Sequence, residues 1–242
     1  MREPDAAFAD PRQAVLYDVF DDDRSDLDAY VAITGELGAR HVIDIGCGTG
    51  SLAVRLAGEG LSVVGVDPAA ASLDVARTKP YADRVTWING DATALASLSG
   101  TADMAVMTGN VAQVFVSDAD WSETLTAVHA ALRPGGSFVF ETRRPEVRAW
   151  EDWDIAPTTV DLLDGRTAVI ARTVTVVDLP LVTFEGSTTI GDEILTSVST
   201  LRFRDRLEIE RDLRSNGFTV SDVRDAPDRP GKEHVFLARA IG

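Results

Sequence analysis

Cysteine is nearly missing from this chain, since Cys47 is its single example among 242 residues. One thiol excludes an internal disulfide framework and a zinc site built on cysteines. No apolar run approaches the roughly 20 residues that a membrane span requires, and the start Met-Arg-Glu-Pro-Asp has no signal-peptide core. We therefore expect a cytoplasmic protein with no membrane partner and no metal site.

Basic residues are also scarce, because 23 Lys and Arg stand against 39 Asp and Glu, for a net charge of −16. Nucleic-acid binding depends on neutralising phosphates with basic side chains, so this balance argues against a nucleic-acid partner. The acidity is typical of a solvated surface. With 45% hydrophobic residues the chain can bury a full core, and we expect one domain with a substantial insert.

A short apolar strand that runs into three alternate glycines organises the rest of the sequence. Val42 and Ile43 are typical of a buried parallel strand, and a helical pattern begins at Ser51. The strand-to-helix turn between them is Asp44-Ile45-Gly46-Cys47-Gly48-Thr49-Gly50. Glycine accepts positive φ and lets a ligand approach bare backbone beside the unpaired N–H groups of the helix. Such a turn could bind either a dinucleotide or S-adenosylmethionine.

Asp44 and the glycine spacing separate these two ligands. The dinucleotide fingerprint is G-x-G-x-x-G, whereas here the third glycine is Gly50 and Ser51 follows it. The Asp44 carboxylate suits a cationic amino-acid group better than a pyrophosphate. The stretch 44–50 resembles motif I of the class I (Rossmann-like) S-adenosylmethionine-dependent methyltransferases. The resemblance implies that the acidic residue and the loop bind this cofactor, through Asp44, Gly46, Cys47, Gly48 and Gly50.

Two further acidic residues follow predicted strands. The strand 61–66 ends in Asp67-Pro68, about 20 residues after the glycine loop, where a carboxylate can accept both ribose hydroxyls. The strand 85–88 leads to Asp91-Ala92, and the resemblance implies that these two residues bind the adenine. Each acidic residue could instead cap a helix. Because the carboxyl ends of parallel strands share one edge of a sheet, the three acidic residues together favour an adenosine site.

The segment after a fourth strand, 102–107, contains groups expected to lie near the methyl acceptor. The resemblance implies that Thr108-Gly109-Asn110 lines the cofactor, and that Asn110 and Gln113 orient the substrate. Both amides could equally satisfy loop backbone groups. The helix 121–132 then leads to Arg133-Pro134-Gly135-Gly136, a turn common in this methyltransferase fold, before a fifth strand at 137–140.

An N-terminal helical cap over residues 1–40 is expected to cover the cofactor. Helical patterns at 11–20 and 25–37 precede the first strand, as in many small-molecule methyltransferases. The resemblance implies that Tyr17 and Arg24 offer a hydroxyl and a guanidinium to the cofactor carboxylate. The alternatives are that Tyr17 lies at the edge of the core and that Arg24 pairs with the nearby acidic run, Asp21 to Asp23.

Four β-rich runs after the fifth strand predict an antiparallel lid inserted over residues 146–204. The runs are rich in Thr and Val, and Asp164-Gly165 and Gly191-Asp192 are two-residue hairpin signals. A lid would shield the cofactor sulfonium from water and hold the acceptor in line. Three side chains at its root could bind an apolar or anionic substrate: Arg143, Trp150 and Trp153. Hinge packing would also explain the two tryptophans.

The predicted fold is a doubly wound α/β sheet of seven mostly parallel strands with an antiparallel last strand, built from residues 41–145 and 205–242. The expected function is transfer of a methyl group from S-adenosylmethionine to a small-molecule acceptor by in-line displacement. No residue is assigned as a catalytic base, since a neutral amine or an ionised oxygen needs none. The alternatives are a cofactor-binding sensor or partner subunit without activity, and an NAD-dependent oxidoreductase. Edge strands of the lid could pair between subunits in a homodimer.

Overall fold

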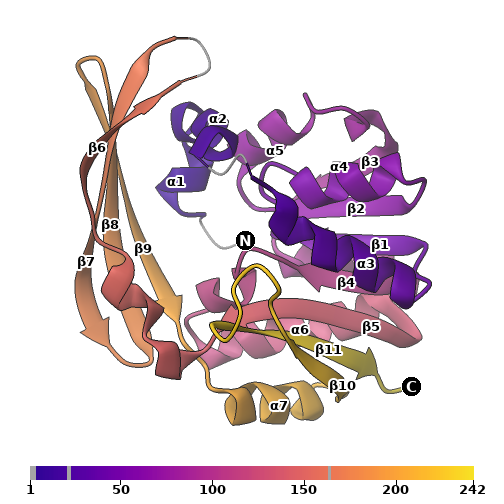
Figure 1. Cartoon of the computed structure of the whole chain (residues 1–242). Coiled ribbons are helices and arrows are strands. Elements are labelled where there is room, and N and C mark those ends of the chain that lie inside the picture. Colours follow the sequence, from indigo (N-terminus) through magenta and orange to yellow (C-terminus); the bar gives the residue numbers. More distant parts are fainter. Residues whose placement is uncertain (1–3, 21–22, 163–164) are drawn as a thin grey trace.

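The computed structural model describes residues 4–20, 23–162 and 165–242. Asp21 and Asp22 of the acidic run, and Asp164 of the first predicted hairpin, lie outside the described residues. Figure 1 shows a sheet flanked by helices, with a second, twisted sheet standing beside it. In the described ranges, no helix has both the length and the apolar character needed to cross a membrane.

The larger sheet has seven strands in the order β10-β11-β5-β4-β1-β2-β3. Its parallel strands are β1 (His41–Ile45), β2 (Ser62–Asp67), β3 (Val85–Asn89), β4 (Ala102–Met107) and β5 (Leu132–Arg143). β11 (Glu233–Ala240) lies between β5 and β10 (Phe218–Asp225) and is antiparallel to both. The predicted seven-stranded sheet with an antiparallel last strand is confirmed.

Helices cover both faces of this sheet (Figure 1). One core cluster joins α3 and α4 to Val42 and Val139, and the other joins α6 and α7 to Ile43 and Phe138. Successive strand residues thus enter opposite clusters, which explains why these strands are apolar at nearly every position. The helices are α3 (Asp28–Glu36), α4 (Ser51–Gly58), α5 (Ala70–Ala76), α6 (Asp118–Ala131) and α7 (Arg206–Ser215). Short 3-10 turns are η1 (Ser25–Leu27), η2 (Ala82–Arg84), η3 (Ala92–Leu98), η4 (Val111–Val114), η5 (Pro145–Val147) and η6 (Ala149–Asp152).

The second sheet is the predicted antiparallel insert, which we call the lid. Its strands are β6 (Ile155–Asp161), β7 (Thr167–Asp178), β8 (Leu181–Ile190) and β9 (Glu193–Arg202), in the order β6-β7-β8-β9. Ile190 pairs with Glu193, so Gly191-Asp192 forms the predicted two-residue hairpin. The four β-rich runs are therefore confirmed as one antiparallel sheet.

Two N-terminal helices, α1 (Ala6–Ala9) and α2 (Pro11–Phe20), join the lid to the glycine loop. On one side Leu16 packs against Leu162 and Ala168 of the lid region. On the other side Asp18 Oδ1 accepts a hydrogen bond of 2.6 Å from Thr49 Oγ1, and Asp18 Oδ2 lies 2.7 Å from Lys79 Nζ. The helical cap is thus attached both to the lid and to the loop that precedes α4.

The fifth strand is longer than predicted, because β5 includes the Pro134-Gly135-Gly136 turn. Ala102 of β4 pairs with Leu132, but Met104 pairs with Ser137, so the turn is accommodated as an irregularity within the parallel pair. Gly135 permits it with a φ of 75°. The prediction of a turn followed by a separate strand was therefore wrong in its boundary.

Gly50 shows why the start of α4 requires glycine. Its φ is 75°, and a Cβ at this position would lie 2.5 Å from Trp87 Cη2 and 2.9 Å from Ala76 Cβ. Trp87 stands on β3 and fills the space between α4 and α5. A side chain at Gly50 would therefore force the two helices or the indole to move.

We expect Gly50→Ala to lower the free energy of unfolding by about 1–3 kcal/mol more than Gly60→Ala. Gly60 has a φ of 90° with no atom within 4 Å of an added Cβ, so its alanine variant has only the backbone strain that both variants share. Urea unfolding of the two variants and the wild type measures the difference. Equal losses of stability would show that the contact with Trp87 is unimportant.

Candidate functional site

The glycine loop is a tight turn with one bare stretch of backbone. Gly46 N–H and Cys47 N–H donate to Val66 O of β2, at 2.8 and 3.2 Å. A Cβ on Gly46 would lie 2.7 Å from the Val111 side chain, whereas one on Gly48 would have no atom within 4 Å. The loop therefore packs closely at Gly46 and at Gly50 but leaves space beside Gly48, where a ligand can approach the backbone.

Asp44 is a buried carboxylate with an unused acceptor atom. Its side chain is 1% exposed, and Oδ1 has no hydrogen-bond partner among the described residues. Burial first, and then the negative charge of Asp67, raise the pKa of Asp44 to about 7. Buried polar atoms are normally paired, so this oxygen is suited to a ligand that donates a hydrogen bond or carries positive charge.

Asp67 connects the end of β2 to the glycine loop. Its Oδ2 accepts from Gly48 N and its Oδ1 from Ala69 N, each at 2.8 Å. Burial raises the pKa of this carboxyl. Because each carboxylate oxygen has two acceptor positions, Asp67 can still accept two hydroxyl groups while it holds the loop. The neighbouring Pro68 is half-buried, and its carbonyl accepts from Asn89 Nδ2 at 3.0 Å.

Asp91 lies after β3 and caps a helical turn. Its Oδ1 accepts from Thr93 N at 3.0 Å and from Thr93 Oγ1 at 2.6 Å, at the start of η3. Ala92 is buried directly after it. Capping, which the sequence left open, is thus one role of this side chain. Since β1, β2 and β3 are neighbours in the sheet, Asp44, Asp67 and Asp91 follow one another along its carboxyl edge.

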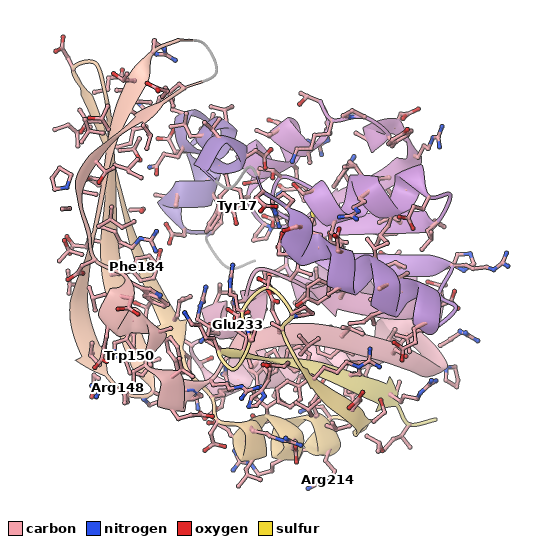
Figure 2. All side chains as sticks on the ribbon, in the orientation of Figure 1. Tyr17, Arg148, Trp150, Phe184, Arg214 and Glu233 are labelled. Carbon is pink, nitrogen blue, oxygen red and sulfur yellow. The ribbon has the colours of Figure 1, made fainter. Side chains whose placement is uncertain are left out.

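Tyr17 and Arg24 lie on the cap side of this edge. The Tyr17 ring packs against Phe8 with 5.6 Å between centroids. Figure 2 shows Tyr17 on the cap, Phe184 on the lid and Glu233 on the main sheet, around the space between the two sheets. Arg24 binds both carboxylate oxygens of Asp26, at 3.1 and 3.2 Å, and Asp26 lies outside the acidic run 21–23 that the alternative named.

Asn110 occupies a strained position after β4. Its φ is 61°, it is 2% exposed, and its Oδ1 has no partner among the described residues. Asn110 N donates to Glu141 Oε1, and Asn110 Nδ2 donates to Glu233 Oε1, each at 3.1 Å. Gly109 beside it has a φ of 66° and open space where a Cβ would lie, and Thr108 is half-buried. This segment therefore connects β4 to β5 and β11.

Glu141 and Glu233 were missed in the sequence, although Glu141 lies near the end of β5 and Glu233 begins β11 at the same edge. Glu141 is 6% exposed and Glu233 is 2% exposed. Glu141 Oε2 accepts from the Tyr30 hydroxyl, and burial together with Glu233 raises the pKa of Glu141. Glu233 Oε1 also accepts from Arg229 Nη1 at 2.8 Å, while its Oε2 has no partner among the described residues. The signal was an acidic residue at the end of an apolar run, as at Asp44.

Three of the four predicted substrate residues meet at the root of the lid. Arg143 Nη1 donates to Gln113 Oε1 at 2.9 Å, and the guanidinium lies 5.2 Å from the Trp153 ring centroid. Burial lowers the pKa of Arg143. Trp150 is 3% exposed and packs with Val182 and Phe203 inside the lid, in a cluster against which Trp153 also packs. Its position is that of hinge packing.

The comparisons with known proteins agree with this geometry. Residues 42–136 match a family model described as a methyltransferase domain. The cypemycin N-terminal methyltransferase of Streptomyces sp. is 28% identical over 145 residues, which are 60% of this chain and 59% of that protein. The ubiquinone biosynthesis O-methyltransferase of Idiomarina loihiensis is 30% identical over 117 residues, 48% of each chain. The chain spans about half the length of the curated relatives it matches.

The fold itself recurs in solved structures. An amino pentose methyltransferase from Micromonospora echinaspora, solved with S-adenosylmethionine bound, superimposes with a TM-score of 0.73. The superposition covers 93% of this chain and 96% of that one at 21% identity, and so shows a shared fold that includes the lid. The match over residues 42–136 and the strand order of the main sheet therefore show a region similar to a methyltransferase domain, within a fold shared with S-adenosylmethionine-dependent methyltransferases.

Proposed function

We propose that this protein is an S-adenosylmethionine-dependent methyltransferase that acts on a small-molecule acceptor. The observation that carries the proposal is Asp44 Oδ1, a buried acceptor atom near the end of β1 that has no partner within the described part of the chain. The ammonium group of the cofactor's methionine end is a donor of the required charge. A pyrophosphate, which has neither donor nor positive charge, would be repelled there.

The remaining cofactor contacts follow the carboxyl edge. The bare backbone at Gly48 would face the cofactor, Asp67 would accept from the ribose hydroxyls, and Asp91 with Ala92 would bind the adenine. Thr108 to Asn110 would line the methyl side, and Tyr17 with Arg24 would cover the methionine carboxylate. Bound there, S-adenosylmethionine supplies a methyl group on a sulfonium, which a nucleophile displaces in line. Positioning of the two reactants can supply about 7 kcal/mol or more of the barrier reduction.

The lid and the helical cap, which lie beside the carboxyl edge of the main sheet, support a small-molecule acceptor. Arg143 lies over Trp153, and Arg172 lies 5.7 Å from the Phe184 ring centroid, so the lid offers cationic and aromatic groups beside the main sheet. The relative from Micromonospora is named for an amino pentose, a small molecule. The cap and the lid are joined through Leu16, which favours a site that is covered during the reaction.

Removal of the Asp67 carboxylate is expected to abolish tight cofactor binding. Asp67→Ala removes two charge-assisted hydrogen bonds to the ribose, so the Kd for S-adenosylhomocysteine should rise about 100-fold or more by calorimetry. Asp74→Ala removes an exposed carboxylate of α5 that pairs with Arg77, and should keep the wild-type Kd. Mass spectrometry of ligand released from the purified protein identifies the natural occupant. Tight NADH binding without S-adenosylmethionine binding would refute the proposal.

As pH rises, ionisation of Asp44 is expected to lower the free energy of unfolding of the unliganded protein and to strengthen cofactor binding. Its folded pKa of about 7 exceeds its ordinary value of 3.8, so the folded state holds this proton more tightly than the unfolded chain does. The contribution of this proton to the free energy of unfolding is fully present below pH 4. It is lost as pH rises toward 7, by at most about 1.4 kcal/mol per pH unit.

Asp44→Asn tests this assignment because the amide does not titrate. Without ligand, the variant should lose less stability than the wild type between pH 5 and pH 8 in urea unfolding. Wild-type affinity for S-adenosylmethionine should increase over the same range as Asp44 ionises, and the variant's affinity should stay low. Parallel stability curves for the two proteins would contradict the buried, titrating carboxyl.

A further inference from the structure

Two oxygen atoms without a hydrogen-bond partner among the described residues belong to neighbouring side chains, on the side of the site away from β2 and β3. They are Asn110 Oδ1 and Glu233 Oε2, and both side chains are 2% exposed. The two side chains are bonded to each other through Asn110 Nδ2 and Glu233 Oε1, at 3.1 Å. Both atoms are acceptors with no donor among the described residues, so a ligand with donor groups would complete their hydrogen bonding.

The neighbouring groups fix these two atoms in place. Glu141 is fully paired, because Oε1 accepts from Asn110 N and Oε2 accepts from the Tyr30 hydroxyl. This contact holds Asn110 at its positive φ. Arg229 Nη1 holds Glu233 through Oε1, at 2.8 Å. Tyr30 and Glu141 are therefore positioning residues, and the two unpaired oxygens are left for a ligand.

The pair lies next to the cofactor site and on the same face of the sheet. Val42, Val139 and Val235 enter one core cluster. Side chains alternate along a strand, so Asp44 and Glu233, each two residues from one of these valines, face the same side. The glycine loop also contacts the segment after Asn110, since Gly46 packs against Val111. A group bound by Asn110 and Glu233 is thus a neighbour of the cofactor.

We propose that Asn110 Oδ1 and Glu233 Oε2 form the acceptor subsite and that the acceptor is an amine, an inference that rests on the proposed function. A primary amine has two N–H donors for the two acceptors, whereas an alcohol has one O–H. In the reaction the nitrogen lone pair forms a bond to the methyl carbon while the carbon–sulfur bond breaks and leaves its electrons on sulfur. The nitrogen becomes positively charged beside the Glu233 carboxylate, and its proton then passes to solvent.

The charges around the subsite suit a neutral amine. Arg229 and Arg143 both face Glu233, at 2.8 and 3.7 Å from its Oε1. Their positive charges disfavour protonation of a bound amine, so its lone pair stays available. A hydroxyl acceptor would need a base instead, and none of the three histidines is placed there. His41 contacts Asp103 at the opposite end of β1, His129 contacts Ile241 O, and His234 follows Glu233 on the opposite face of β11.

The test uses three cofactor-site ligands that differ at one position. S-adenosylhomocysteine has a neutral sulfur there, S-adenosylmethionine has a methylated cationic sulfur, and sinefungin has a carbon that carries an ammonium group. Sinefungin alone therefore places N–H donors at the position of the methyl group, directed at the atoms that would bind the acceptor nitrogen. In Glu233→Gln, Asn110 and Arg229 would bind the amide oxygen, so an NH₂ group would replace Oε2 and face the ammonium with donors.

We expect Glu233→Gln to weaken sinefungin binding about tenfold or more in calorimetry, while the Kd of S-adenosylmethionine changes less than about threefold. Asn110→Gly retains the positive φ and the N–H bond to Glu141 but lacks Oδ1, and should also weaken sinefungin binding about tenfold or more. Glu123→Gln removes an equal charge from the exposed face of α6 and should change neither ligand.

The inference is overturned if both variants leave sinefungin binding unchanged, or if sinefungin and S-adenosylmethionine lose affinity equally, since Glu233 would then act only through its charge. Binding of S-adenosylhomocysteine by each variant establishes that it is folded. A wild-type protein that binds none of the three ligands would instead refute the proposed function.

Discussion

Burial of carboxylates at one edge of the main sheet is the constraint on which the rest of the site depends. A buried carboxylate is costly unless donors surround it. The chain supplies backbone donors to Asp67 and a tyrosine hydroxyl to Glu141, and an arginine to Glu233. Across residues 4–20, 23–162 and 165–242, one oxygen of Asp44 and one of Glu233 have no donor. These are the positions where a ligand, and not the protein, completes the hydrogen bonding.

The helical cap contacts both the glycine loop and the lid, so the cap and the lid form one continuous cover over this side of the main sheet. Asp18 connects α2 to Thr49 and Lys79 beside the glycine loop. Asp5, just before α1, accepts a hydrogen bond from Ser199 of the lid. Displacement of the cap from the loop would therefore disturb its contacts with the lid as well. Access to the cofactor position and access to the lid's inner side are coupled by these contacts.

The sequence predicted the main sheet because buried parallel strands are apolar at nearly every position and end in turns with glycine or aspartate. It also placed Asp44, Asp67 and Asp91 at one edge, since that follows from parallel strands alone. Glu141 and Glu233 could not be paired in this way. They meet because β11 inserts beside β5, a contact between strands about 90 residues apart that no local pattern encodes. Hinge packing was among the roles foreseen for Trp150, but its contact with Val182 depends on how the lid folds back and could not be predicted.

The acidic residues on the glycine-loop side and those on the β11 side favour different chemical groups in a ligand. Burial and the negative charge of Asp67 raise the pKa of Asp44, so the glycine-loop side favours a ligand that carries its own positive charge. Glu141 and Glu233 are balanced by Arg143 and Arg229, so the β11 side needs hydrogen-bond donors but no net charge. A cationic cofactor beside a neutral amine satisfies both conditions. Methyl transfer then moves the positive charge from sulfur to nitrogen, toward Glu233, whose carboxylate stabilises the product cation.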